Sequence, residues 1–409
     1  MFALSAMSYF DRTVLSIAGP GIMKEFHISE TQMGSVFSAF LLTYTLMMTP
    51  GGALADRFGG RLVLSISGLG AALFTGLTSI CGPAGLGGLL GVVPAFVVMR
   101  LAFGICASPI YPSTSRIAAA WIPPSQQARV QAIIMGAAAV GAAVAPMLFS
   151  HLIGAYGWRV SFWFAAAATA VLIAIWYLTV QDHPPGRAHT AAAQRVGEKG
   201  AWRRLLADRN LLLLTGSYFA LNYFEYIFFF WLYYYFGQIR KMGMDQSAFY
   251  TTLMWIAWVV MTPIGGWVSD RLITRFGMRN GRRIVPMVGL TVSAILVYIG
   301  CNVTGTVATV TLLCLSLGFA ASTDGPYWAA AIDAGGRHSG TGCAIVNTGG
   351  NLGGMLAPVV TPLIASWAGW SAGIYAGGAL ALLGVAVWFF IGVKPSAHAT
   401  VTAAPEPVS

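Results

Sequence analysis

Long apolar runs separated by short polar stretches extend along the chain as far as residue 393. A helix needs about 20 mostly apolar residues to cross a bilayer. Twelve runs have about this length, and each predicts a membrane-spanning helix: residues 2–22, 33–54, 62–81, 92–118, 130–153, 159–180, 211–236, 247–268, 284–301, 306–332, 340–366 and 371–393. The pattern therefore predicts an all-α membrane protein.

Composition supports a lipid environment. The chain is 57% hydrophobic and 9% charged, whereas soluble domains average about 25% charged residues. In a soluble protein the net charge of +10 would suggest nucleic-acid binding. Here the basic residues occupy short loops between apolar runs, so the bilayer is the predicted partner and no nucleic acid is expected.

The basic residues also predict the orientation. Seventeen of the 23 lysines and arginines fall in loops or at span ends on one side of the membrane. The remaining six are Lys24, Arg159, Arg240 and Lys241 on the other side, and Arg12 and Arg100 within spans. Cytoplasmic loops are enriched in basic residues. We therefore expect a multi-pass protein of the cell inner (plasma) membrane with both termini in the cytoplasm.

The two ends of the chain carry further expectations. The first apolar run contains Asp11 and Arg12 and lacks a basic leader, so no cleavable signal peptide is predicted. The apolar start at Met1 favours a true start upstream. The tail after Lys394 has the composition of a disordered segment.

A polar stretch between the sixth and seventh runs divides the chain. It contains Pro184-Pro185-Gly186 and several basic residues. The predicted organisation is an N-terminal six-helix bundle (1–180), a cytoplasmic linker (181–210), a C-terminal six-helix bundle (211–393) and a disordered cytoplasmic tail (394–409).

The two halves repeat a motif. Gly52-Ala53-Leu54-Ala55-Asp56-Arg57 recurs as Gly266-Trp267-Val268-Ser269-Asp270-Arg271, at an offset of 214 residues (270 − 56). Each copy follows the second span of its half. Two parallel repeats of about six spans are the architecture of the major facilitator fold. The pattern thus predicts two pseudo-symmetric six-helix bundles.

The repeated motif resembles the loop motif of the major facilitator superfamily, which implies a gating role. Asp56 and Arg57 would sit at the cytoplasmic mouth, where Asp56 can pair with Arg116 or meet a helix N-terminus of the other half. Asp270 and Arg271 form the second copy. Contacts made only when the inner side is closed bias a two-state equilibrium. The alternative is that each Asp-Arg pair merely caps a tight turn.

A closer resemblance is to the anion:cation symporter family, which includes bacterial hexuronate, glucarate and galactonate transporters. Four segments carry it: Ser8-Tyr9-Phe10-Asp11-Arg12-Thr13-Val14-Leu15-Ser16, Pro50 to Gly59, Arg116-Ile117-Ala118-Ala119-Ala120-Trp121-Ile122-Pro123-Pro124 with Arg129 following, and Val346-Asn347-Thr348-Gly349-Gly350-Asn351-Leu352-Gly353-Gly354. The resemblance covers nearly the whole chain and implies transport of an organic anion.

Two arginines within spans are the candidate anion ligands. A charge at mid-span is costly, on the order of 2.5–3.5 kcal/mol on insertion scales, and a guanidinium fork matches a carboxylate. The resemblance implies that Arg12 and Arg100 contact the substrate and that Asp11 takes part in proton coupling. The alternative is a structural pair, Asp11–Arg12 or Arg100 with another acid, that only holds helices together.

Polar and aromatic residues complete the candidate site. Tyr9 lies three residues before Arg12 and shares its helix face. Tyr44, Trp328 and Asn347 fall where the resemblance implies substrate contacts. The alternative for each aromatic residue is ordinary helix packing.

Two departures change the expected chemistry. The family usually has a glutamate in span 4 where this chain has Ala107, and often a polar residue in span 5 where this chain has Ala139. Two other acids, Glu225 and Asp324, lie within predicted spans and are further candidates for proton coupling. For each of these the alternative is a fixed partner of an arginine or a helix cap.

These observations predict a monomeric secondary transporter that imports a small organic anion (a carboxylate, sugar-acid-like or aromatic) by symport with protons, or less readily with sodium. The alternatives are an uncoupled facilitator, an antiporter or exporter, and a transporter-like ligand sensor. No enzyme motif, cofactor loop or metal-ligand cluster is present in the sequence. The five single cysteines predict neither ligands nor a disulfide framework.

Overall fold

The computed structural model describes residues 1–121, 124–181, 201–335 and 339–392. Every regular element in this part of the chain is helical, as predicted. The elements are α1 (Phe2–Phe26), α2 (Glu30–Phe58), α3 (Gly60–Leu77), η1 (Thr78–Ile80), α4 (Leu86–Leu90), α5 (Val92–Ala107), α6 (Ile110–Trp121), α7 (Pro124–Thr179), α8 (Ala201–Leu206), α9 (Arg209–Tyr234), η2 (Tyr235–Ile239), α10 (Met244–Asn302), α11 (Thr306–Ala321), α12 (Asp324–Gly335), α13 (Ser339–Ala368) and α14 (Trp370–Trp388). The predicted tail and residues 182–200 of the predicted linker lie outside the described residues.

The helices have membrane length. Eight helical stretches among the described residues are long and apolar enough to cross a bilayer. Two of them, in α7 and α10, are pairs of helices joined at Gly157 and Gly277. With each pair counted as two, and with α1 and α9 of 25 and 26 residues, the described part holds twelve helices of membrane length. All five cysteines are free thiols.

Tight turns between spans use glycine with a positive φ, a conformation that is strained for residues with a side chain. Gly59 between α2 and α3 has φ 91°, and Gly277 in α10 has φ 78°. Gly157 in α7 (φ 81°) and Gly369 before α14 (φ 85°) are each followed by tryptophan, 212 residues apart (369 − 157). Equivalent turns therefore recur at half-chain distance, which extends the repeat predicted from the loop motif.

The fourth and tenth spans, predicted as unbroken, are each interrupted. Between α5 and α6 the break contains Pro109, whose ring and missing amide hydrogen disfavour a continuous helix. A second-span glycine packs against each break. A Cβ on Gly51 would lie 2.9 Å from Pro109, and one on Gly265 would lie 1.8 Å from the Ser322 carbonyl oxygen. The two glycines are 214 residues apart (265 − 51).

The chain forms two compact units. Unit 1 comprises residues 1–190, 226–259 and 354–373, and unit 2 comprises residues 191–225, 260–353 and 374–409. The predicted division by chain halves, at the linker 181–210, stays a prediction.

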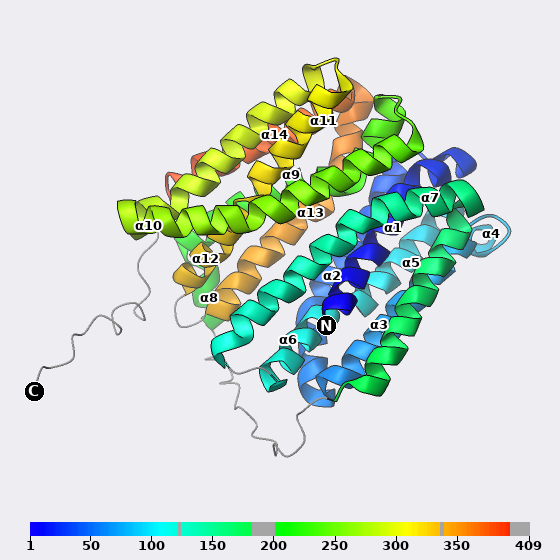
Figure 1. Ribbon diagram of the computed structural model, residues 1–409, viewed down its shortest axis with the longest axis horizontal. Coiled ribbons are helices and arrows are strands. Elements are labelled where there is room, and N and C mark those ends of the chain that lie inside the picture. Colours follow the sequence, from blue (N-terminus) through cyan, green and yellow to red (C-terminus); the bar gives the residue numbers. More distant parts are fainter. Residues whose placement is uncertain (122–123, 182–200, 336–338, 393–409) are drawn as a thin grey trace, which may run out of the picture. The chain divides into compact units, whose positions relative to one another are not determined.

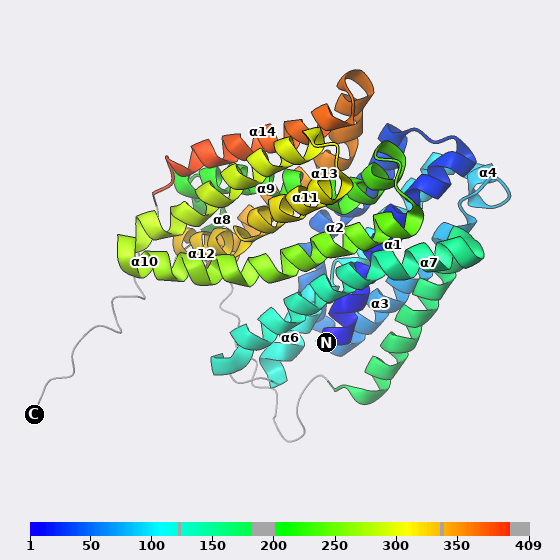
Figure 2. The ribbon, with the colours of Figure 1, turned by 45° about the horizontal axis from the view of Figure 1, so that its top comes forward.

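Within unit 1, α1 packs along α7, α2 along α5, and α3 against both α5 and α7. Figures 1 and 2 show α1 beside α7, which folds back on itself at its kink. The contact is close because small residues face each other. A Cβ on Gly141 would lie 1.9 Å from the Ala6 carbonyl oxygen. Such small-residue contacts replace the hydrophobic driving force that lipid does not provide.

Unit 1 also joins segments from both ends of the sequence. A Cβ on Gly34 of α2 would lie only 2.0 Å from the Pro358 carbonyl oxygen of α13. Ser38 donates a hydrogen bond to the Met355 carbonyl oxygen at 2.6 Å, and the Tyr234 hydroxyl donates one to Glu30 at 2.7 Å. The second helix, α2, is thus in direct contact with α9 and α13.

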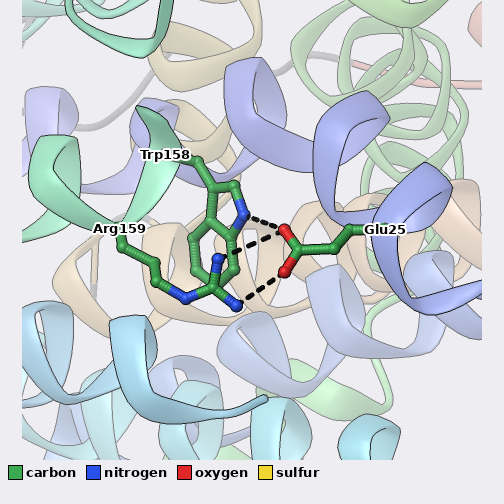
Figure 3. A network of polar contacts seen from close by, with 3 residues as sticks. All are labelled: Glu25, Trp158 and Arg159. Atoms are coloured by element: carbon green, nitrogen blue, oxygen red, sulfur yellow. Dashed lines mark hydrogen bonds and ion pairs between the residues drawn. The ribbon is translucent and has the colours of Figure 1, made fainter. Parts of the chain in front are cut away.

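A polar cluster fixes the end of α1 to the second arm of α7 (Figure 3). The Trp158 indole donates to Glu25 Oε2 at 2.7 Å, and Arg159 Nη2 pairs with Glu25 Oε1 at 2.7 Å. The Arg159 guanidinium also lies over the Trp158 ring, 4.3 Å from its centroid. Glu25 lies beyond the predicted first span, and its hydrogen bond with Arg159 lowers the pKa of its carboxyl.

Candidate functional site

Three charged side chains are almost completely buried in unit 1. Asp11 is 1% exposed, Arg12 6% and Arg100 3%. Asp11 and Arg12 lie near the middle of α1, and Arg100 lies in α5. Buried charges in membrane helices are costly and usually mark a pathway or binding site.

Asp11 takes a hydrogen bond from a distant helix. Its Oδ2 accepts from the Thr169 hydroxyl of α7 at 2.8 Å. Its Oδ1 has no hydrogen-bond partner among the described residues. Both buried guanidinium groups are within electrostatic range of the carboxylate. The structure thus brings together the three charged residues that the sequence singled out.

Aromatic rings surround the Arg12 guanidinium. Its Cζ lies 4.9 Å from the ring centroids of both Tyr9 and Phe40, and 4.4 Å from that of Tyr44. The Tyr111 ring is 6.0 Å away. Cations within about 6 Å of a ring face are attracted by its quadrupole, more strongly when desolvated. Tyr9 and Tyr44 thus lie against Arg12. Their predicted contact with a substrate stays a prediction.

The sequence analysis did not identify two members of this group, Phe40 and Tyr111. The spacing of Tyr111 from Arg100 could have indicated its place in the site. Tyr111 follows Arg100 by eleven residues (111 − 100), close to three helical turns, so the two share a face of a regular helix. Phe40 precedes the predicted Tyr44 by four residues on α2 and shares its face.

The guanidinium groups of both buried arginines keep unused donors. The Nε and Nη2 atoms of Arg12 and of Arg100 have no hydrogen-bond partner within the described part of the chain. Arg100 lies over Phe103, at 5.3 Å from the ring centroid. Among the described residues, no ion pair joins Asp11 to either arginine. Two forks with free N–H groups can bind an anion bidentately.

The second-half candidates belong to unit 2. The exposed fraction of Trp328 is 39%, and its ring meets that of Tyr218 edge-on at 6.3 Å. Asn347 is half-buried in α13. Their contact with a substrate stays a prediction.

The two further acids also lie in unit 2. Asp324 begins α12, and its Oδ1 accepts a long hydrogen bond of 3.5 Å from the Tyr218 hydroxyl. Nearby, Tyr327 shares a buried cluster with Ser217, at 2.5 Å, and with the Trp388 indole, at 3.0 Å. Among the described residues, Asp324 therefore borders a polar network and forms no ion pair with an arginine.

Glu225 occupies the place of Asp11 in the repeat. Tyr9-Phe10-Asp11 recurs as Tyr223-Phe224-Glu225, again at an offset of 214 residues (225 − 11). The same offset relates the two loop motifs. The Arg12 position is Tyr226 in the second copy, so the repeat keeps the acid and loses the cation.

The predicted gating residues have different surroundings. The Asp56 side chain lies outside the described residues, and Arg57 is exposed above the ring of Phe58. Arg116 is half-buried. Their gating role stays a prediction.

In the second loop motif the structure adds a partner that the sequence did not identify. Arg282 pairs with Asp270 at 3.4 Å and with Asp333 of α12 at 3.3 Å. Arg271 instead lies over Trp267, 4.4 Å from the ring centroid. The second copy of the motif is thereby tied to the end of α12.

The two alanines that depart from the resembled family are buried. Ala107 and Ala139 are each 1% exposed. Ala107 lines a small cavity beside Asp11. The interior of unit 1 therefore carries fewer polar side chains than the resemblance implies.

These features define a class: an all-helical membrane protein with two arginines and an aspartate buried among its helices. The sequence profile described as Major Facilitator Superfamily matches residues 1–342. The chain therefore belongs to the Major Facilitator Superfamily, and the predicted fold class is confirmed.

The chain is also similar to individual transporters within this superfamily. The chain is 31% identical over 368 residues to the "Probable sulfoacetate transporter SauU" of Cupriavidus necator, covering 87% of this chain and 83% of the relative. It is 28% identical to the "Hexuronate transporter" of Bacillus subtilis, covering 96% and 93%. Both relatives are named as anion transporters, as the resemblance predicted.

Solved structures support the fold. A bacterial homolog of the human lysosomal transporter Spinster, crystallised in an inward-facing conformation, matches with a TM-score of 0.80 at 16% identity, covering 100% of this chain and 97% of that one. A D-xylose-proton symporter matches with a TM-score of 0.71 at 18% identity, covering 97% of each chain.

Proposed function

We propose that the protein imports a small organic anion by symport with protons. The observation that carries the proposal is the pair of buried arginines whose Nε and Nη2 groups have no partner in the described part of the chain. Burying a charged N–H donor without a hydrogen-bond partner costs free energy, on the order of several kcal/mol. A bound anion would satisfy them, and no metal or cofactor is invoked.

The proposed substrate class follows from the surroundings of the arginines. The tyrosine rings at positions 9, 44 and 111 offer flat surfaces with hydroxyl tips, which suit the carbon skeleton of a small acid. The two relatives are named for the transport of sulfoacetate and hexuronate, which are small organic anions. Ala107 and Ala139 provide no hydrogen bonds for sugar hydroxyls, which favours a compact or aromatic anion over a fully hydroxylated one.

Asp11 is the first candidate for the proton. An ionised Asp11 competes with the substrate for the positive potential of Arg12 and Arg100, whereas a protonated Asp11 leaves both charges to the substrate. Glu225, at the repeat-equivalent position, and Asp324 are the second-half candidates. Sodium is the less favoured coupling ion.

In the proposed cycle, Trp328 and Asn347 contact the substrate, and Asp56, Arg57, Arg116, Asp270 and Arg271 stabilise the state that is closed on the cytoplasmic side. The orientation rests on the positive-inside rule, with both termini cytoplasmic in the inner membrane. The contacts of Gly34 with Pro358, and of Ser38 with Met355, would belong to a closed outer side. The proposed carrier acts as a monomer.

Purified protein in liposomes tests the proposal. A thermal-shift screen with sulfoacetate, hexuronates, galactarate and aromatic carboxylates first identifies a stabilising ligand, because ligands that bind only the folded state raise its stability. That ligand should then accumulate inside liposomes above the outside level under an imposed inward proton gradient. Mere equilibration would indicate an uncoupled facilitator, outward-driven exchange an antiporter, and binding without transport a sensor. Each of these outcomes contradicts the proposed symport.

A further inference from the structure

A small cavity lies beside Asp11 in the interior of unit 1. Its volume is about 20 Å³, and residues of α1, α3, α5, α6 and α7 form its wall. Ser8, Asp11 and Thr169 are the lining residues with oxygen in their side chains, and the others are apolar. Ala107 forms part of the wall, so we expect a larger side chain at that position to reduce the cavity.

Two side chains that line this cavity each carry an oxygen atom without a partner among the described residues. Asp11 Oδ1 and Ser8 Oγ are both buried, and neither has a hydrogen-bond partner among the described residues. Thr169 is not a hydrogen-bond partner of Oδ1, because its hydroxyl donates to the other carboxylate oxygen, Oδ2. Ser8 and Asp11 are three residues apart on α1 and therefore share one face of the helix.

The volume of the cavity and the oxygen-bearing side chains in its wall suit one water molecule. A cavity needs roughly 10–15 Å³ to hold one water molecule, and such a water needs two to four polar partners. The cavity has room for one water, and two of its lining residues carry an unsatisfied oxygen. Hard cations prefer about six oxygen ligands, so a metal ion does not suit this site.

We infer that the cavity is an internal water site, in which one water molecule bridges Asp11 Oδ1 and Ser8 Oγ. This water completes the hydrogen bonding of Asp11 in either protonation state. It donates to Oδ1 of the ionised carboxylate and accepts from Oδ1–H of the protonated one, while the Ser8 hydroxyl rotates to suit.

The functional role of the water rests on the proposed proton symport. A proton that reaches the site on this water as hydronium moves to Oδ1, which leaves a neutral water and a neutral carboxyl group. The reverse transfer releases it. In this chain the water beside Ala107 thus serves as the immediate donor and acceptor for Asp11.

Three variants test the water site. Ala107→Val fills the cavity and Ser8→Ala removes one of the two partners of the water. Ser16→Ala is the matched control, because this buried α1 serine already donates to the Thr13 carbonyl oxygen within its own helix. Structures of the wild type and variants at about 2 Å resolution should show density within about 3.2 Å of both oxygens in wild type and Ser16→Ala, and none in Ala107→Val.

Transport in liposomes provides the second readout. Ala107→Val and Ser8→Ala should keep substrate exchange and lose proton-driven accumulation by about tenfold, as expected for loss of a hydrogen bond to a charged group. Empty density in the wild type, at a resolution that reveals other internal waters, would overturn the water site. So would density and thermal stability that depend on sodium. Density in the wild type without proton-driven transport would refute the proposed symport and leave the water site standing.

Discussion

The Thr169 hydroxyl donates a hydrogen bond to Asp11 Oδ2 over 2.8 Å, across 158 residues of chain. Both residues are at most 5% exposed. The bond connects α7 to the buried acid beside the two arginines of the candidate site. A buried carboxylate that loses a hydrogen-bond donor is left unsatisfied in a low-dielectric interior. We therefore expect this hydrogen bond to affect both the stability of the fold and the coupling of transport to protons.

Replacing Thr169 tests this dependence. Thr169→Val keeps the shape of the side chain and removes the donor. We expect it to destabilise the protein by about 1.5–3 kcal/mol, the range for a hydrogen bond to a charged group, and to reduce proton-driven accumulation more than exchange. Thr169→Ser keeps the hydroxyl and should restore both. Unchanged melting and accumulation in Thr169→Val would show that the bond has no role.

The two buried arginines should not tolerate lysine. Arg12→Lys and Arg100→Lys keep the charge and lose the planar fork. If each fork binds the anion bidentately, uptake affinity should fall by about tenfold or more. Radiolabelled substrate uptake at matched expression measures this. Arg275→Lys, at an exposed position over Phe276, is the control. Wild-type affinity in Arg100→Lys would remove that residue from the site.

The close contact between Gly34 and Pro358 should limit how the helices close. Gly34→Val would place a side chain where even a Cβ lies 2.0 Å from the Pro358 carbonyl oxygen. We expect α2 and α13 to separate and transport to fall by at least about tenfold, since overpacking typically costs 1–3 kcal/mol. Gly21→Ala, where nothing lies within 4 Å of the added Cβ, is the control.

Labelling distinguishes this effect from misfolding. Ser38 donates to the Met355 carbonyl oxygen in the same contact. In a background without the five native cysteines, Ser38→Cys should react faster with an impermeant maleimide when Gly34→Val is also present. If Ser38→Cys is labelled at the same rate with and without Gly34→Val, and both variants are monodisperse, the predicted separation of α2 and α13 is contradicted.

The cluster of Glu25, Trp158 and Arg159 predicts a pH dependence. The hydrogen bond with Arg159 lowers the pKa of the Glu25 carboxyl in the folded protein. The ionised Glu25 carboxylate therefore contributes its full stabilisation of the folded protein above the ordinary pKa of a glutamate. This stabilisation is lost as pH falls through the lowered pKa. Glu25→Gln should reduce melting temperature at neutral pH and have no effect at the acidic end. The effect should be small, about 0.2–1 kcal/mol, because the pair is solvent-exposed. A constant difference at every pH would contradict the assignment.

The two acids that pair with Arg282 should contribute differently to the stability of the protein. The side chain of Asp333 is 9% exposed and that of Asp270 is 77% exposed. Asp333→Asn should therefore destabilise the protein by more than the roughly 0–1 kcal/mol expected for Asp270→Asn, because water screens an exposed pair. Thermal unfolding of both variants measures the difference. If Asp270 also gates transport, as proposed, Asp270→Asn should alter transport despite its small effect on stability.

The sequence alone determined the class of this protein. The lengths of its apolar runs, the bias of its basic loops and the duplicated Asp56-Arg57 and Asp270-Arg271 motif predicted a two-fold repeated membrane carrier. It also identified Asp11, Arg12 and Arg100, because a charge within an apolar run is conspicuous and costly. These signals are local or periodic, so they can be read without knowing which helices pack together.

Only the tertiary structure decided what surrounds those charges. Thr169 meets Asp11 because α7 packs along α1, and Tyr111 approaches Arg12 although 99 residues separate them (111 − 12). The cavity beside Ala107 exists because side chains from five helices leave a gap that none of them fills. In lipid, apolar faces do not specify their neighbours, so partner choice depends on detailed packing of small residues such as Gly34 and Gly141. For that reason the periodicity of the chain could place the charged residues within helices but could not assign their partners.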